Sequence, residues 1–251
     1  MSTSTLMTIP LEISWETLPE DFILPEEPVE NVEHPLLASA LREILELAGV
    51  IPAPALMGSN LGICVKVNGQ LVIKAPDWFY VSQVNSTVSN RRSYTPNLEG
   101  EIPLLVMEFL SDNDGGEYSM YGKPPFGKWW FYERILEVPV YVIFVPGTGE
   151  LEIYRLKNGQ YQQVPAPENN LYWLEEMQLF LGIWSGTKSN RTGNWLRWWD
   201  AQGNLLPWGT EKVAMQEAEK ERERQEKELA LEKAQRLADK LRELGVDPET
   251  L

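Results

Sequence analysis

The sequence contains very little cysteine and histidine. Its 251 residues include one cysteine, Cys64, and one histidine, His34. A single cysteine excludes an internal disulfide framework and a cysteine-rich metal site. A single histidine excludes multi-histidine zinc sites and leaves little room for a histidine-based catalytic triad. Any metal ion must therefore be held mostly by carboxylates, which suit magnesium or manganese.

Positive charge and long apolar runs are scarce as well. The chain has 22 Lys and Arg residues against 37 Asp and Glu residues, a net charge of −15. This net negative charge argues against nucleic-acid binding through overall positive charge. It does not exclude a local basic groove that binds nucleic acid. The longest strongly apolar stretch, Val138 to Pro146, is too short to cross a bilayer as a helix. Residues 1–16 lack the features of a signal peptide. We therefore expect a soluble, cytoplasmic protein without membrane association.

Composition divides the chain into four expected regions. Residues 1–34 are acidic and contain several prolines, which predicts an irregular lead-in. Residues 35–165 carry helix and strand patterns and form the expected core. Residues 166–209 contain six tryptophans, which predicts a small sheet extension packed on the core. Residues 210–251 are rich in charges of both signs and predict a long helix.

Periodicity and turn signals predict the elements of the core. Apolar residues recur at helical spacing between Pro35 and Gly49, which predicts a helix there. Asn-Gly pairs at 68–69 and 158–159 predict two hairpins. The run 138–145 is apolar throughout and predicts a central strand covered on both faces. The remaining expected elements are strands at 78–81 and 104–110 and a helix at 128–136.

Apolar residues in the last region repeat at coiled-coil spacing. Ala230, Ala234, Leu237, Leu241 and Leu244 are separated by four, three, four and three positions. Such a seam covers about two heptads and is typical of helices that pair side by side. We therefore expect a short coiled coil and a homodimer.

Two acidic residues lie where a metal site could form. Glu108 interrupts the apolar strand 104–110, and a buried ionised carboxylate costs several kcal/mol unless a cation or metal ion pairs with it. Asp77 directly precedes the strand 78–81 and becomes the natural second ligand if the two strands are neighbours. Two nearby acids repel each other unless a divalent cation lies between them. The structural alternatives are a salt bridge for Glu108 and a turn-forming role for Asp77.

A lysine follows these acids at the start of the expected helix 128–136. Lys128 opens this helix, and Tyr132 lies one turn later on the same face. A lysine placed there can orient an attacking water and offset charge on a phosphoryl transition state. The alternative is a solvated surface lysine.

The order and spacing of these pieces resemble a known family. The pieces are Pro76-Asp77 with the following Trp-Phe-Tyr-Val, the segment 103–111, Lys128 with Tyr132, and the strand 138–146. Across residues 35–165 the chain resembles the bacterial Uma-two family of restriction endonucleases, which is similar to the PD-(D/E)XK nucleases. The resemblance implies an α/β (α+β) fold with a mixed central sheet flanked by helices. It also implies an endonuclease that uses Mg²⁺ or Mn²⁺ to hydrolyse the phosphodiester bonds of DNA.

The resemblance implies roles for three residues. Asp77 matches the aspartate of the family motif and Glu108 matches its second acid, so both are expected to bind the metal and act in catalysis. The lysine usually found two positions after the glutamate is replaced by Leu110. Lys128, on the following helix, is expected to take its place and to position the attacking water.

The rest of the expected site is less defined. The backbone carbonyl of Phe109 could add a metal ligand. Glu43 and Glu46 on the first helix are candidate third acids, and the alternative for Glu43 is a solvated helix residue. His34 could line the site from the helix start or simply cap or pack. Val140 and Val145 stand where the family often has acids, so the completeness of the site is open.

Other functions and surfaces stay open. The acidic charge and Leu110 favour a catalytically weak or inactive nuclease-like scaffold that assembles through its C-terminal helix. A carbohydrate-binding surface of Trp195, Trp198 and Trp199 would require exposed rings. The basic and aromatic stretch 188–199 could stack exposed bases, or its tryptophans could belong to the core. A local cationic rim for DNA could include Arg91, Arg92, Lys123 and Lys128.

Overall fold

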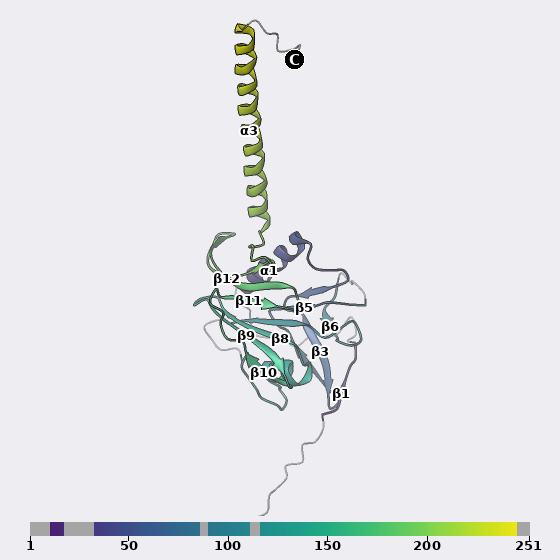
Figure 1. Cartoon of the computed structure of the whole chain (residues 1–251). Helices are drawn as coiled ribbons and strands as arrows, with labels where there is room; N and C mark the ends of the chain where they lie inside the picture. Colours follow the sequence, from purple (N-terminus) through teal and green to yellow (C-terminus); the bar gives the residue numbers. More distant parts are fainter. Residues whose placement is uncertain (1–10, 18–32, 86–89, 111–115, 245–251) are drawn as a thin grey trace, which may run out of the picture. The chain divides into compact units, whose positions relative to one another are not determined.

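The computed structural model describes residues 11–17, 33–85, 90–110 and 116–244 (Figure 1). The chain divides into two compact units, Met1–Leu206 and Pro207–Leu251. Most of the irregular lead-in expected at residues 1–34 lies outside the described residues.

A mixed sheet of six strands forms the centre of the first unit, in the order β10-β9-β8-β7-β5-β2. Its strands are β2 (Leu56–Gly58), β5 (Trp78–Val81), β7 (Leu105–Phe109), β8 (Val140–Val145), β9 (Glu150–Lys157) and β10 (Gln160–Gln163). β7 and β8 run parallel, and the other neighbours run antiparallel. Together with the helices described below, this sheet confirms the expected α/β (α+β) fold class, consistent with a restriction-endonuclease-like fold.

Two smaller sheets complete the unit. One contains β1 (Ile13–Ser14), β3 (Gly62–Val67), β4 (Gln70–Lys74) and β6 (Ser93–Tyr94), and the other contains β11 (Leu171–Leu174), β12 (Leu179–Lys188) and β13 (Arg191–Trp199). Both predicted Asn-Gly hairpins are present, since β3 pairs with β4 and β9 pairs with β10. Asn68 and Asn158 adopt positive φ angles of 49° and 52°, which asparagine tolerates and these turns require.

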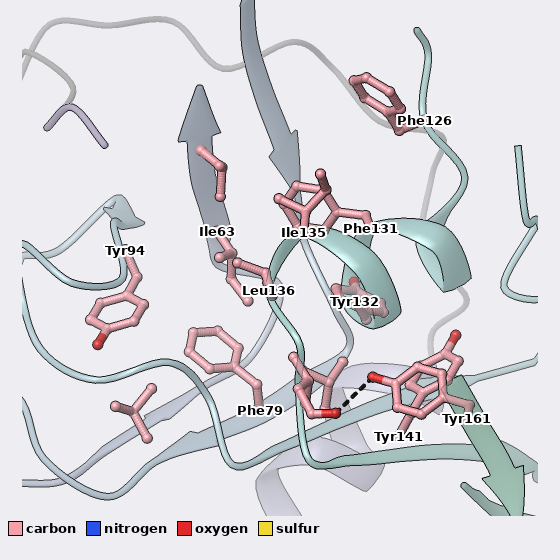
Figure 2. Close-up of a cluster of buried hydrophobic side chains, with 14 of the residues drawn as sticks. Ile63, Phe79, Tyr94, Phe126, Phe131, Tyr132, Ile135, Leu136, Tyr141 and Tyr161 are labelled. Atoms are coloured by element: carbon pink, nitrogen blue, oxygen red, sulfur yellow. Dashed lines mark hydrogen bonds between the residues drawn. The ribbon is translucent and has the colours of Figure 1, made fainter. Parts of the chain in front are cut away.

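Two helical segments pack in this unit. α1 (Glu33–Ala48) buries one apolar stripe and packs against β13. α2 (Lys128–Trp130) continues into the π-helical segment η1 (Phe131–Ile135), which forms one apolar cluster with side chains of β3, β5, β7 and β8. Figure 2 shows Phe131 and Tyr132 of this segment gathered with Tyr141 and Tyr161. This packing fixes the position of the side chains at the start of α2.

Two of the four tryptophans of β12 and β13 belong to the core. Trp195 is 1% exposed, and Trp198 is fully buried with its ring 6.1 Å from that of Trp78. Arg197 is buried as well, and it donates a hydrogen bond to the backbone carbonyl of Leu206 at 2.7 Å. A carbohydrate-binding surface needs exposed rings, so that interpretation is wrong for Trp195 and Trp198. The alternative that these tryptophans form a core is confirmed.

The second unit contains the helix α3 (Gly209–Glu243), none of whose residues is buried. Leu231 and Leu237 are 71% and 62% exposed, and ion pairs such as Arg236–Glu232 link successive turns. The coiled-coil seam and the homodimer stay predictions. Among the described residues, no helix has the length and apolar character needed to span a membrane.

Candidate functional site

Strand pairing brings Asp77 and Glu108 together. Trp78 of β5 lies opposite Met107 of β7, so the antiparallel register sets Asp77 opposite Glu108. Residues directly opposite in such a pair point to the same face of the sheet. One Asp77 oxygen accepts a hydrogen bond from the backbone N–H of Phe109 at 2.6 Å. The two strands are therefore neighbours, as the metal-site hypothesis requires.

Lys128 and Tyr132 both reach the carboxylate of Glu108. Glu108 is fully buried. The Lys128 ammonium donates a hydrogen bond to its Oε2 at 3.1 Å, and the Tyr132 hydroxyl donates one to its Oε1 at 2.8 Å. Lys128 and Tyr132, one helical turn apart, thus both donate hydrogen bonds to the Glu108 carboxylate.

Glu117 is a second acid on Lys128, and the sequence patterns did not identify it. Its Oε1 lies 3.3 Å from the Lys128 Nζ, and its side chain is 8% exposed. The Tyr141 hydroxyl fixes the local backbone by donating to the Glu117 carbonyl at 3.0 Å. The only available signal was an acid shortly before Lys128, because the contact itself arises from tertiary packing.

His34 contacts Asp77 from the first turn of α1. Its Nδ1 lies 3.2 Å from Asp77 Oδ1, and the two side chains are 11% and 13% exposed. A hydrogen bond to a carboxylate requires the proton on Nδ1. The other ring nitrogen, Nε2, is buried without a hydrogen-bond partner among the described residues. Of the two sequence interpretations, the structure favours the one in which His34 lines the site.

The structure does not bring Glu43 to Asp77 and Glu108. Glu43 Oε2 forms an ion pair with the Lys188 ammonium at 2.6 Å. Along α1, Glu43 is nine residues beyond His34, which corresponds to about 13 Å of helix rise. The second acid on Lys128 therefore comes from the segment after β7 and not from the first helix.

Burial and neighbouring charges shift the ionisation of this cluster. Burial raises the pKa of Glu108 to about 8, and Asp77 contributes to the rise while Lys128 opposes it. Burial alone would lower the pKa of Lys128, but the charges of Glu108 and Glu117 hold that pKa above its usual range. Lys128 therefore keeps its positive charge at neutral pH.

Acidic side chains are the potential metal ligands of this cluster. Asp77, Glu108 and Glu117 supply three carboxyl groups, and Lys128 is the single ammonium that contacts Glu108 and Glu117 in the described structure. Carboxylate oxygens are the ligands preferred by Mg²⁺ and Mn²⁺. Within the described residues, no group of three or more His, Cys, Asp and Glu side chains is arranged to hold a metal ion. An ion held by Asp77 and Glu108 would thus take its remaining ligands from backbone carbonyls and water, as Mg²⁺ commonly does.

The raised pKa of Glu108 predicts how stability depends on pH in metal-free protein. The folded state holds the Glu108 proton more tightly than the unfolded state, whose pKa is near 4.5. The stability gained from this tighter proton binding is fully present below pH 4.5 and is lost as the pH rises through about 8. We expect Glu108→Gln to gain up to about 4 kcal/mol in unfolding free energy over the wild type between pH 5 and pH 8.

Urea unfolding in EDTA at both pH values measures this difference. The matched control is Glu46→Gln, which alters an exposed glutamate paired with Arg42 and should follow the wild type. Parallel pH profiles for the wild type and Glu108→Gln would contradict the raised pKa of Glu108.

The chain is similar to a known protein family over the region that contains these residues. A family model, Uma2, described as "Putative restriction endonuclease", matches residues 13–187. The match spans more than half of the chain and includes Asp77, Glu108 and Lys128. No curated protein matches the chain significantly.

Proposed function

This chain belongs to the Uma2 family, part of the restriction-endonuclease-like PD-(D/E)XK superfamily, and we propose on that basis that it is a metal-dependent endonuclease acting on DNA. The observation that carries the proposal is the position of Lys128. Its ammonium lies 3.1 Å from Glu108, while Asp77 lies opposite Glu108 in the strand register. Two acids and one lysine therefore gather in one place, although Leu110 occupies the usual position of the lysine.

The acids are held in fixed orientations. Asp77 is fixed by the Phe109 N–H and by His34, and Glu108 is fixed by Tyr132 and Lys128. Such preorganised groups need little rearrangement when charge develops at a substrate. When held between these two acids, Mg²⁺ or Mn²⁺ would polarise a phosphate and lower the pKa of water.

Lys128 supplies the fixed positive charge of the site. Because its pKa lies above its usual range, Lys128 is protonated at neutral pH and can donate hydrogen bonds to the attacking water or to a phosphate oxygen. A cation at that point offsets the negative charge that accumulates on the phosphoryl group in the transition state. Glu117 holds the lysine in position through its contact at 3.3 Å.

Plasmid nicking tests this function. We expect the full-length chain to convert supercoiled plasmid to nicked and linear forms with Mg²⁺ or Mn²⁺, and to leave it intact in EDTA. The conversion is followed by gel electrophoresis over time. The absence of cleavage of both the plasmid and a single-stranded DNA circle with either metal would contradict the endonuclease proposal, and equal cleavage in EDTA would contradict metal dependence.

A further inference from the structure

We propose that the site acts on single-stranded nucleic acid, whose bases stack on an aromatic surface formed by Tyr118 and Tyr121 beside Lys128. This inference rests on the proposed function of the acidic site and names its substrate class.

Exposure of aromatic rings is the first support. Tyr118 and Tyr121 are 41% and 55% exposed, and no other aromatic side chain in the described part of the chain is exposed to this degree. Met120 between them is 60% exposed. A chain rich in aromatic residues thus buries or half-buries all the others described, and keeps two partly exposed rings in one short segment.

The segment is tied to the turn that carries Lys128. Tyr118 directly follows Glu117, and its ring stacks on that of Trp129 with centroids 6.3 Å apart. Its hydroxyl donates a hydrogen bond to Glu152 at 2.7 Å. The Tyr121 carbonyl accepts a hydrogen bond from the Gly127 N–H at 2.9 Å, one residue before Lys128. These contacts hold the backbone of the tyrosine segment beside the first residues of α2, where Lys128 lies.

The net negative charge and the ion pairs of the protein disfavour binding to duplex DNA. Arg91, expected in a cationic rim for DNA, pairs with Glu99, and two cations of the stretch 188–199 are also paired with acids, Lys188 with Glu43 and Arg191 with Glu33. Duplex DNA is bound mainly by cations that neutralise many phosphates. Cations already paired with acids, on a protein with a net charge of −15, are poorly placed to do this. Single strands gain affinity from base stacking as well, and their binding tolerates any sequence.

The burial of the acidic side chains also favours a flexible single strand of nucleic acid as the substrate. Glu108 is fully buried, and the side chains of Asp77 and Lys128 are 13% and 18% exposed. A scissile phosphate must approach these recessed groups closely. Lys123 is exposed in the same segment as the two tyrosines, and its positive charge can pair with phosphates of the single-stranded nucleic acid.

Fluorescence anisotropy tests the substrate class without requiring cleavage. The probe is a fluorescein-labelled 15-nucleotide single-stranded DNA of mixed sequence, compared with the same strand in a duplex, in EDTA. We expect the full-length chain to bind the single strand at least about tenfold more tightly than the duplex. Tyr121→Ala should weaken single-strand binding about tenfold, the effect of losing one stacked base. Tyr121→Phe, which keeps the ring, should bind like the wild type.

The outcomes separate this inference from the proposed function. Equal or tighter binding of the duplex, no binding of either probe, or unchanged single-strand binding by Tyr121→Ala would overturn the single-strand inference. Metal-dependent cleavage of duplex plasmid together with any of these results would leave the endonuclease proposal standing. Stacking-dependent binding without cleavage of single-stranded or duplex DNA would support the aromatic surface and contradict the endonuclease.

Discussion

Replacing Asp77 with asparagine is expected to reduce metal-dependent DNA cleavage by a factor on the order of a thousand while the chain stays folded. Asparagine has nearly the same shape, and its carbonyl oxygen can still accept the Phe109 hydrogen bond. It lacks the charge needed to hold a divalent cation, and removing a preorganised electrostatic group commonly costs catalysis a factor of about 10² to 10³. Initial rates of plasmid nicking at saturating Mg²⁺ measure the loss.

The matched control for this change is Asp200→Asn. Asp200 lies on the surface in the turn after β13, where it accepts hydrogen bonds from the Gln202 and Asn204 backbones. This variant should nick DNA at the wild-type rate. Circular dichroism should be alike for both variants. Wild-type activity in a folded Asp77→Asn variant would contradict the role of Asp77 in the site.

Replacing Lys128 with methionine is expected to lower the cleavage rate by about 10² to 10³. Methionine keeps much of the length and apolar volume but removes the ammonium that lies 3.1 Å from Glu108 and 3.3 Å from Glu117. Transition-state charge on the phosphoryl group then loses its nearest fixed positive partner. The loss should appear in kcat, because the group acts mainly when charge develops.

Lys157→Met is the control for this second change. Lys157 ends β9 and is exposed, so its replacement removes the same charge from the protein without touching the acidic cluster. We expect its cleavage rate to equal that of the wild type. A similar loss in both variants would indicate a general effect of charge on DNA binding, and an unaffected Lys128→Met variant would assign the role of Lys128 to another group.

Local patterns predicted the parts of this fold that local physics determines. The Asn-Gly pairs predicted both hairpins because only a few residues tolerate the backbone angles of those turns. The one-turn spacing of Lys128 and Tyr132 predicted that they share a face, and both contact Glu108. An acid inside an apolar strand predicted that Glu108 needs a partner, because burial of an unpaired charge is costly.

Contacts made by tertiary packing escaped the same reasoning. Glu117 reaches Lys128 through the path of the chain after β7, and no periodic pattern records that path. Glu43 looked suitable as a third acid on the first helix, yet it pairs with Lys188 from β12. The catalytic and metal-binding roles of Asp77, Glu108 and Lys128 remain predictions, because geometry brings these residues together without testing their chemistry.

We propose that Asp77 and Glu108 share one divalent cation. The most direct test of this proposal is a crystal of the full-length chain soaked in Mn²⁺ and measured for anomalous scattering from manganese. We expect one anomalous peak within coordination distance of both carboxylates, and no peak there in Asp77→Asn. Manganese bound only elsewhere, or carboxylates that stay bound to His34, Lys128 and Tyr132 with no ion between them, would contradict it.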